Sequence, residues 1–425
     1  MLIEATSQTT LGPVYTLTGT DDLFVGADVT IRCTYNDPVN HTGADAVISW
    51  EGTHSITVAG TIIGEDEAIN LVGCLTAQTV TIQATGVLIS GGDGMVQDAD
   101  GVILDGLGSH LRNAGTITAY GSAVSVIAPE GGVTSIVNLG SMTGRVSGIW
   151  HKFGNGTLSF TNSGTVSSDA FSYLGNSGVD RLTNSGTLNG DIALGGGDDL
   201  FVGSTGTVNG LIDGGDGDDT FRPGSHAEIM DGGDGIDLLD FTAATTAVTL
   251  NLTTPAQNSG AQVAGDSYTG FENVLGGGFS DRLTGDAGAN RLEGAGRLDT
   301  LAGGAGDDTL IGGRGDDRCY GGQGADTFLF QNLKHLGDRI YDFTSASDVI
   351  AFEGEQFGFG SFAGALDETA FVAGHAALDA DDRLLFDAAT HLLWFDADGS
   401  GASAAVVVAS LQSGATLTAA DILIL

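Results

Sequence analysis

The sequence predicts an all-β protein: a parallel β-solenoid (β-helix) that continues into a parallel β-roll and ends in a β cap. The chain of 425 residues contains 70 glycines but only five prolines, which indicates tight turns that recur along the chain. Two kinds of internal repeat follow one another, and a single copy of either is too short to bury an apolar face alone. We therefore divide the chain into a solenoid at 1–193, a roll at 194–330 with a linker at 241–269, and a cap at 331–425.

The roll is built from a repeat of nine residues. Residues 276–329 read GGGFSDRLT, GDAGANRLE, GAGRLDTLA, GGAGDDTLI, GGRGDDRCY and GGQGADTFL, which are six copies in unbroken phase. Two earlier copies, GGDGDDTFR at 214–222 and GGDGIDLLD at 232–240, keep every defining position, and LGGGDDLFV at 194–202 keeps most of them. The shared pattern is GGxGxDxUx, where U is a large apolar residue.

Each part of this pattern has a mechanical role. Glycine permits positive φ and close approach of backbones in a half-turn, and the segment after the aspartate forms a short strand with U pointing inward. The aspartate lies at the turn, beside backbone carbonyl groups. Stacked turns therefore present carboxylate and carbonyl oxygens to a shared gap, and such a flexible cage suits Ca²⁺ better than Zn²⁺ or Mg²⁺.

This nonapeptide resembles that of the repeats-in-toxin (RTX, hemolysin-type calcium-binding) family. Asp199 is a weaker first copy, and Asn290 replaces one aspartate, which leaves a neutral and weaker ligand. The stretch 270–292 is similar to the lead-in of the family. The resemblance implies that several calcium ions are held by Asp199, Asp219, Asp237, Asp281, Asn290, Asp299, Asp308, Asp317 and Asp326, together with Gly214, Gly232, Gly303, Gly312 and Gly321.

A looser repeat precedes the nonapeptides. Its units recur at intervals of 20 to 30 residues: VAGTI (58–62), QATGV (83–87), NAGTI (113–117), NLGSM (138–142), NSGTV (162–166), NSGTL (184–188) and STGTV (204–208). Each places alternating apolar residues after an Asn or Gly turn, as in the coils of secreted bacterial β-helices, which they resemble. We expect the first coil to open with the strand-like VYTLTGTDDLFV (14–25), leaving an edge that a second copy of the chain can cover.

The glycine rhythm stops at residue 331. The segments DRIYDFTSASDVIAFEGEQF (338–357) and LTAADILIL (417–425) are similar to the C-terminal cap of type I-secreted proteins, whose uncleaved signal is read by the secretion machinery. The resemblance implies a secreted, extracellular or cell-surface protein of a Gram-negative bacterium. A cap also covers an open strand edge. Asp396 and Asp398 in FDADGSGA (395–402) fit either a metal-free hairpin turn or one more calcium site.

The composition excludes several partners. Fourteen Lys and Arg against 54 Asp and Glu give a formal net charge of −40, which disfavours nucleic acid and anionic lipid. The N-terminus lacks the features of a secretory signal, and the apolar run at 404–411 is too short to span a bilayer, so we expect no membrane insertion. Cys33, Cys74 and Cys319 are too few for a disulfide framework, and we expect reduced core residues, with Cys319 at an inward U position.

No catalytic residue is assigned from the sequence, because it contains neither an HExxH nor a GxSxG motif. The best cluster for chemistry on a solenoid face is His151, Lys152, Asp169 and Tyr173. We therefore predict a non-enzymatic, extracellular structural or surface protein that folds on calcium binding and self-associates. A polysaccharide-acting, lyase- or epimerase-like enzyme and a calcium-dependent adhesin stay open as alternatives.

Overall fold

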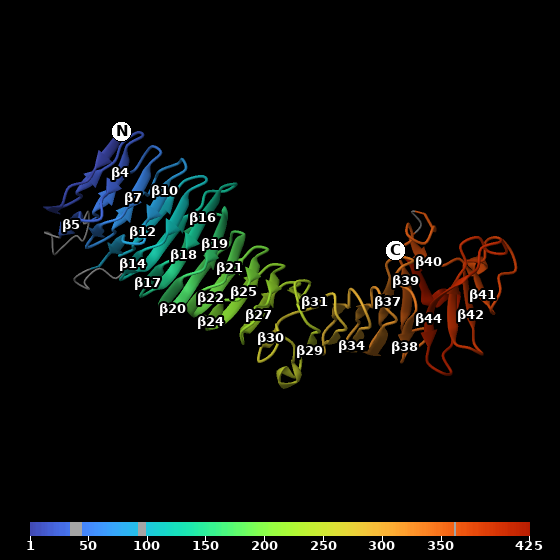
Figure 1. The fold of residues 1–425 in the computed structure, drawn as a ribbon. Helices are drawn as coiled ribbons and strands as arrows, with labels where there is room; N and C mark the ends of the chain where they lie inside the picture. Colours follow the sequence, from blue (N-terminus) through green and yellow to red (C-terminus); the bar gives the residue numbers. More distant parts are fainter. Residues whose placement is uncertain (35–44, 92–98, 361–362) are drawn as a thin grey trace. The chain divides into compact units, whose positions relative to one another are not determined.

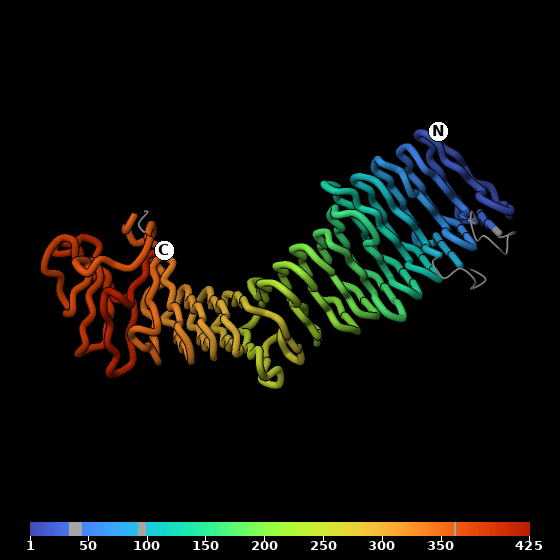
Figure 2. The backbone as a smooth tube through the Cα atoms, turned by 180° about the vertical axis from the view of Figure 1, so that it is seen from behind, coloured from blue at the N-terminus to red at the C-terminus, as the bar shows by residue number. Residues whose placement is uncertain are grey.

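Parallel β-strands dominate the structure, a computed structural model that describes residues 1–34, 45–91, 99–360 and 363–425 (Figure 1). The chain divides into two compact units, Met1–Asp237 and Leu238–Leu425. Each unit is a stack of coils, as the tube in Figure 2 shows. The strands of one coil pair in parallel with those of the next coil. The predicted all-β, parallel β-solenoid is confirmed. The division into three parts at 193 and 330 stays a prediction.

In the first unit, each coil contributes up to three strands, and these form three parallel rows. The first row is β1 (Leu2–Glu4), β4 (Asp22–Val25), β7 (Ser55–Val58), β10 (Thr79–Ile82), β13 (His110–Asn113), β16 (Val133–Asn138), β19 (Thr157–Asn162), β21 (Asp180–Asn184), β23 (Leu200–Val202) and β26 (Thr220–Arg222).

The second row is β2 (Gln8–Leu11), β5 (Thr30–Thr34), β8 (Thr61–Ile63), β11 (Val87–Ile89), β14 (Thr116–Ala119), β17 (Ser141–Gly144), β20 (Thr165–Asn176), β22 (Thr187–Gly196) and β24 (Thr207–Asn209). The third row is β3 (Tyr15–Thr16), β6 (Val47–Ile48), β9 (Ile69–Asn70), β12 (Val102–Asp105), β15 (Ser122–Ile127), β18 (Ser147–Phe153), the later parts of β20 and β22, β25 (Leu211–Asp216) and β27 (Ile229–Asp234).

In this unit, the register between successive coils aligns residues of the same chemical type. In the first row, one inward position of each strand is a buried apolar residue stacked on its counterpart in the next coil. Because each side chain is covered by the coils on both sides, a coil gains its core only by stacking. This column consists of Leu23, Ile56, Val80, Leu111, Ile136, Phe160, Leu182, Phe201 and Phe221.

The Asn of the looser repeat forms a buried ladder. The side-chain amide of Asn113 donates to Oδ1 of Asn138 at 2.9 Å, and Asn138 donates to Asn162 at 2.8 Å. Asn162 donates in turn to Asn184 at 2.9 Å. All four side chains are buried. An amide both donates and accepts, so the ladder satisfies its own members, which explains why Asn opens these units.

The first coil starts close to the beginning of the described chain. β1, β2 and β3 lie within residues 2–16, Leu2 pairs with Asp22, and the strand-like segment 14–25 contains β3 and β4. β1 is only three residues long and shows no apolar periodicity, which is why the pattern missed it. Its strand conformation follows from pairing with β4.

In the second unit, a coil of eighteen residues contributes two strands, one to each of two rows. The first row is β28 (Leu238–Asp240), β31 (Asn273–Leu275), β33 (Arg291–Glu293), β35 (Thr309–Ile311), β37 (Thr327–Phe330), β39 (Val349–Phe352) and β45 (Ile422–Ile424), with β40 (Gly364–Ala365) antiparallel to β45. The second row starts with β29 (Thr249–Asn251), β32 (Arg282–Thr284), β34 (Thr300–Ala305), β36 (Arg318–Gln323) and β38 (Asp338–Ile340).

The second row then ends in a small sheet that covers the last coil. It consists of β44 (Val406–Leu411), β43 (Leu392–Phe395), β42 (Leu384–Asp387) and β41 (Phe371–Ala373). β43 and β44 form an antiparallel hairpin, and Asp398 between them accepts a hydrogen bond from the Ser403 N–H, which favours the hairpin-turn interpretation of this segment. The remaining elements are β30 (Ser267–Thr269) and three short 3₁₀ helices, η1 (Pro255–Gln257), η2 (Glu368–Ala370) and η3 (Ala419–Asp421).

Candidate metal centre

The nonapeptide folds as a half-turn followed by a short strand. In GGAGDDTLI, Gly304 and Gly306 have φ of +117° and +106°, values that favour glycine. The strand β35 follows at once, and its central residue Leu310 is buried. The second and fourth positions of the repeat therefore need glycine for backbone reasons, and the U position supplies the core.

The repeat aspartates join coil to coil. Oδ1 of Asp308 accepts a hydrogen bond from the backbone N–H of Asn290 at 2.8 Å, and the N–H of Asp308 donates to Oδ1 of Asp326 at 3.0 Å. The described residues form three such ladders, one in the first unit and two in the second. They are Asp180, Asp199, Asp219 and Asp237; Asp281, Asp299, Asp317 and Asp338; and Asn290, Asp308, Asp326 and Asp348.

The second carboxylate oxygen is left over in most ladder members. Oδ2 makes no hydrogen bond to any described residue in Asp199, Asp219, Asp299, Asp308, Asp317 and Asp326, although these carboxylates are buried. A buried anionic oxygen without a partner is costly. A cation beside Oδ2 would remove this cost.

The protonation behaviour of the aspartates agrees with that reading. Burial raises the pKa of Asp199 to about 9, that of Asp299 to about 8, and those of Asp219 and Asp308 to about 7. The backbone N–H that each one accepts lowers the pKa, and the neighbouring carboxylate of its ladder raises it again. The ionised form therefore needs a positive charge nearby.

The first glycine of each repeat keeps open the space that Oδ2 faces. A β-carbon built on Gly303 would lie 2.1 Å from Oδ2 of Asp308 and 2.6 Å from the carbonyl oxygen of Gly321, one coil further on. The same two kinds of oxygen converge beside Gly214, at 2.2 Å from Asp219 Oδ2 and 2.2 Å from the Gly232 carbonyl. Carboxylate and carbonyl oxygens meeting in a space without a side chain fit Ca²⁺, which takes six to eight oxygen ligands.

The structure brings together the residues that the sequence assigned to calcium. Gly312 adds a clear case, because a β-carbon there would lie 2.6 Å from Oδ2 of Asp317 and 2.7 Å from Oδ2 of Asp338. Gly321 lies beside Asp326 in the same way, with 2.2 Å to Oδ2. These residues would hold the ions through paired carboxylate and carbonyl oxygens.

Three of the assigned residues, Asp281, Asn290 and Asp199, depart from this arrangement. Oδ2 of Asp281 accepts the Gly277 N–H at 2.8 Å and so is not left over. Oδ1 of Asn290 accepts the Asp286 N–H at 2.8 Å, so its neutral oxygen keeps the ladder position without a charge. In the coil of Asp199, the first-glycine position is Leu194, which lies in register with Gly214 and is fully buried. That coil therefore has a β-carbon where the other coils have none.

Three ladder members, Asp180, Asp338 and Asp348, were not predicted from the repeat pattern. Asp338 accepts the Asp317 N–H at 3.0 Å, and Asp348 accepts the Asp326 N–H at 3.1 Å. The signal that identifies them is Asp-x-U at the start of a strand, as in DRI and DVI, without the glycine pair. Their spacing of 21 and 22 residues also breaks the period.

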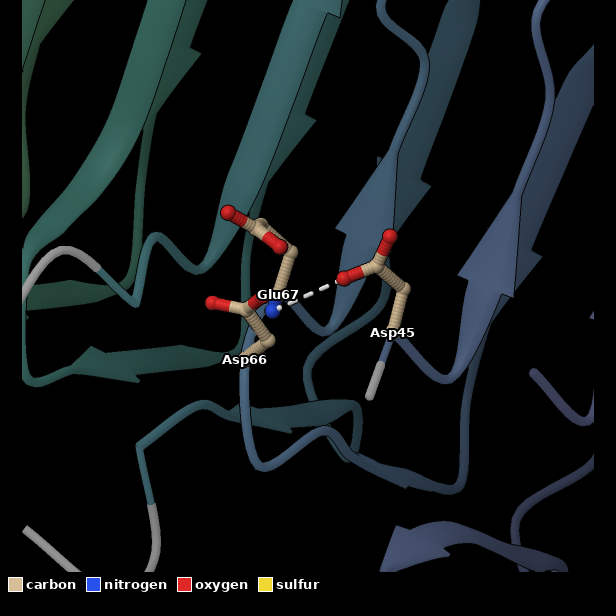
Figure 3. A group of neighbouring side chains, drawn as sticks. All are labelled: Asp45, Asp66 and Glu67. Atoms are coloured by element: carbon tan, nitrogen blue, oxygen red, sulfur yellow. Dashed lines mark hydrogen bonds between the residues drawn. The ribbon is translucent and has the colours of Figure 1, made fainter. Parts of the chain in front are cut away.

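A separate acidic group lies in the first unit (Figure 3). Among the described residues, carboxylate oxygens of Asp45, Asp66 and Glu67 lie within 4.8 Å of one another. Asp45 already accepts the Glu67 N–H at 3.2 Å and the Asn70 side-chain amide at 3.0 Å. Burial, followed by Asp45, raises the pKa of Glu67 to about 11, so this group relieves its repulsion by taking up a proton.

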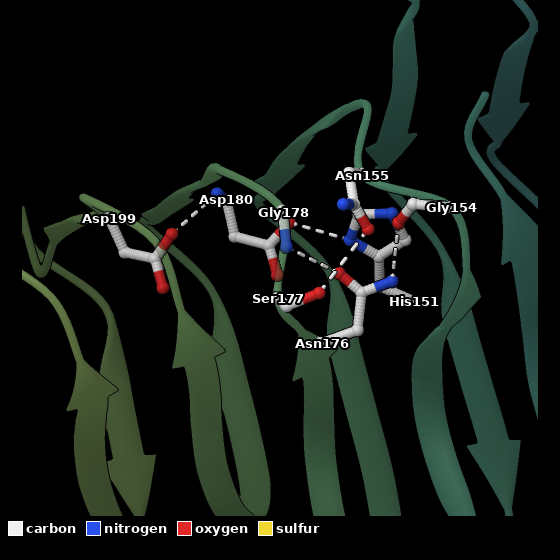
Figure 4. A network of polar contacts seen from close by, with 8 residues as sticks. All are labelled: His151, Gly154, Asn155, Asn176, Ser177, Gly178, Asp180 and Asp199. Carbon is white, nitrogen blue, oxygen red and sulfur yellow. Dashed lines mark hydrogen bonds and ion pairs between the residues drawn. The ribbon is translucent and has the colours of Figure 1, made fainter. Parts of the chain in front are cut away.

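The residues considered for catalysis do not form a surface site. His151 and Tyr173 are fully buried, and Nδ1 of His151 lies 2.8 Å from Oδ1 of Asp180 (Figure 4). Lys152 lies over the Trp150 ring, 4.6 Å from its centroid. Asp169 instead lines an open pocket of about 400 Å³ with Tyr120 and Arg145.

The fold and these ladders define a β-solenoid protein whose coil turns present carboxylate and carbonyl oxygens that could hold calcium. In a comparison with protein families, the model of the RTX calcium-binding nonapeptide repeat (4 copies) matches three segments of the chain. They are residues 204–239, 267–296 and 293–328. The chain therefore contains calcium-binding repeats of the RTX type within residues 204–328. A comparison with curated proteins gives no match. Within the described residues, no helix has both the length and the apolar character needed to cross a membrane.

Proposed function

We propose that this is a secreted, non-enzymatic structural or surface protein that folds on calcium outside the cell and then self-associates. The observation that carries the proposal is the set of buried aspartate ladders, in which Oδ2 of residues such as Asp308 and Asp317 has no hydrogen-bond partner in the described chain. Without a divalent ion, these stacked carboxylates repel one another and resist burial.

The ion affinity expected for such a site explains where folding takes place. Extracellular calcium modules bind at about 10⁻⁴–10⁻³ M, well above free calcium in the cytosol. A chain with a net charge of −40 stays expanded when no ion neutralises it. An unfolded chain suits export through a narrow channel, which supports the type I secretion route and the Gram-negative host that the RTX resemblance implies.

The placement of the candidate catalytic residues supports a non-enzymatic role. His151 and Tyr173 lie inside the solenoid with no exposed surface, so they cannot contact a polymer substrate. Lys152, the remaining strong base of that cluster, lies 3.9 Å from Asp100. Turnover of an acidic polysaccharide by the purified protein would favour the enzyme alternative, and glycan binding without turnover would favour the adhesin.

The first coil supports self-association. Among the described strands, β1 and β3 each pair with a single neighbour, so they form a strand edge on one side of this coil. Leu2 and Leu11 on the same coil are 62% and 66% exposed. Calcium would reduce the repulsion between chains and allow a second copy to cover this edge.

Sedimentation of the purified chain in millimolar calcium tests the proposal. We expect larger species as concentration rises, and expanded monomers in excess chelator. The double variant Leu2→Lys, Leu11→Lys should stay monomeric in calcium. Leu378→Lys, at a position that is 80% exposed in the other unit, is the matched control and should associate as the unmodified chain does. A single monomeric species across a hundredfold concentration range would overturn self-association, and identical sedimentation in calcium and chelator would overturn calcium-dependent folding.

A further inference from the structure

Residues 175–183 occupy the place of a nonapeptide, although they lie outside the matched repeats. Their sequence, GNSGVDRLT, keeps the first and fourth glycines, the aspartate and the large apolar residue, but has Asn at the second position. The N–H of Asp180 donates to Oδ1 of Asp199 at 2.6 Å, and that of Asp199 donates to Asp219 at 2.8 Å. Asp180 is therefore the first member of the ladder in this unit.

The space beside Gly175 is lined by the same two kinds of oxygen as the space beside the first glycine of the repeats. A β-carbon built on Gly175 would lie 2.6 Å from Oδ2 of Asp180 and 1.7 Å from the carbonyl oxygen of Leu194. Leu194 begins the next coil, so its carbonyl has the role that the Gly232 carbonyl has for Gly214. A carboxylate oxygen and a backbone oxygen thus converge here too.

Buried atoms without partners surround this space. Asp180 has no exposed surface, and its Oδ2 makes no hydrogen bond to any residue in the described ranges. The hydroxyl of the fully buried Tyr173 lies near this carboxylate and likewise makes no hydrogen bond that meets normal geometry within the described chain. An unpaired buried carboxylate oxygen at this position calls for a cation.

The turn that carries Asp180 is held by its own hydrogen bonds (Figure 4). Oδ1 of Asn176 accepts the Gly178 N–H at 2.7 Å, and its amide donates to the Gly154 carbonyl of the preceding coil at 2.8 Å. Asn176 therefore shapes the half-turn that a glycine shapes in the repeats.

His151 ends the ladder on the solenoid side. Its Nδ1 lies 2.8 Å from Oδ1 of Asp180, the atom to which the backbone N–H of a preceding ladder residue would donate in a longer ladder. A neutral imidazole with the proton on Nδ1 donates to an ionised carboxylate and adds no negative charge. His151 thus positions Asp180 and leaves Oδ2 for another partner.

We propose that this coil binds an additional calcium ion, with Oδ2 of Asp180 and the carbonyl oxygen of Leu194 among its ligands and His151 as a positioning residue. The proposal extends calcium binding from the matched repeats into the three-row solenoid. It rests on the proposed calcium-dependent folding, because the ion would order the coil next to the first repeats.

Counting bound calcium by native mass spectrometry on the full chain tests the site. Asp180→Asn keeps the shape of the side chain and an acceptor for His151 but removes the charge, and it should lower the count by one ion. Asp169→Asn, the same change at an exposed position on β20, is the matched control and should leave the count unchanged. An equal count in the Asp180→Asn variant and the unmodified chain would overturn the site.

Amide hydrogen exchange of the unmodified chain gives a second readout that needs no variant. We expect calcium to slow exchange at least tenfold in residues 173–200, and Asp180→Asn to abolish that protection while residues 281–330 keep theirs. Equal exchange at 173–200 with and without calcium would overturn the site even if Asp180→Asn does not fold. An unmodified chain that binds no calcium at all would overturn the proposed function, and this site with it.

Discussion

The backbone N–H of Asp299 donates to Oδ1 of Asp317 at 2.7 Å, although eighteen residues separate them. This contact fixes the carboxylate and leaves Oδ2 facing the space beside Gly312. The asparagine ladder behaves differently, because the amide of Asn113 donates to Asn138 and accepts from the Gly115 N–H. The amide side chains of the asparagine ladder donate to and accept from one another. The carboxylate side chains of an aspartate ladder can only accept, so their second oxygens depend on a cation.

The charge of Asp317 should set the calcium affinity of its coil. Asp317→Asn keeps an oxygen for the Asp299 N–H but removes the anionic ligand, and we expect the calcium midpoint of folding to rise roughly tenfold. The control is Asp316→Asn, one residue earlier and exposed. It should shift the midpoint less than about twofold. Equal midpoints in calcium titrations followed by circular dichroism would contradict the assignment.

Calcium removal should unfold the second unit because its two carboxylate ladders lose their counter-ions. In excess chelator, we expect amides in β32 to β37 to exchange at the rate of an unstructured chain, and in millimolar calcium to be protected. The buried apolar U residues, such as Leu283 and Leu301, cannot compensate in coils this thin. Hydrogen exchange read by mass spectrometry checks this. Equal protection in both conditions would count against calcium-dependent folding.

The asparagine ladder should contribute stability that does not depend on calcium. Asn138→Ala removes the acceptor for Asn113 and the donor for Asn162, and we expect the free energy of unfolding to fall by about 3 kcal/mol. Asn209→Ala is the control. Asn209 is exposed and donates to Asn189 at 2.8 Å, so its loss should cost less than about 0.5 kcal/mol. Denaturant unfolding in calcium gives both values, and equal losses would argue against the ladder.

One repeat carries backbone strain that glycine would relieve. Ala295 has φ of +72° at the second position of GAGRLDTLA, where the repeats one coil away on either side have Gly277 and Gly313. We expect Ala295→Gly to raise the free energy of unfolding in calcium by about 1 kcal/mol. Ala305→Gly, in the ordinary strand β34, should instead lower it by about 0.5–1 kcal/mol. A fall in stability for both variants would show that the strain at Ala295 is negligible.

The sequence predicted the repeat coils well because each position of the repeat has one structural role that one type of residue fulfils. Gly304 and Gly306 adopt positive φ, Leu310 fills the core, and Asp308 lies at the turn. The residue types of the repeat therefore predict the conformation of the coil. The sequence also predicted the burial of Cys319, whose position in the repeat is the inward one.

Residues outside the strict period were missed because stacking, not spacing, places them. Asp338 and Asp180 reach the ladders through coils whose turns contain Leu336 and Asn176 in place of the usual glycines. The first strand, Leu2–Glu4, was missed for the same reason, since its conformation comes from pairing with residues 22–24. Such features depend on register between coils, which a local pattern does not contain.

Cys319 offers a test of the inward position of the repeat. It is 3% exposed, and burial raises the pKa of its thiol well above the usual value, so the reactive thiolate is scarce in the folded chain. We expect labelling by a thiol reagent to be at least a hundredfold slower in millimolar calcium than in chelator. Cys33, which lies in the first unit and has a pKa raised to about 11 by burial, should respond less to chelator because its coil contains no carboxylate ladder. Labelled peptides resolved by mass spectrometry separate the two thiols. Rapid labelling of Cys319 in calcium, at the rate seen in chelator, would contradict its place in the core.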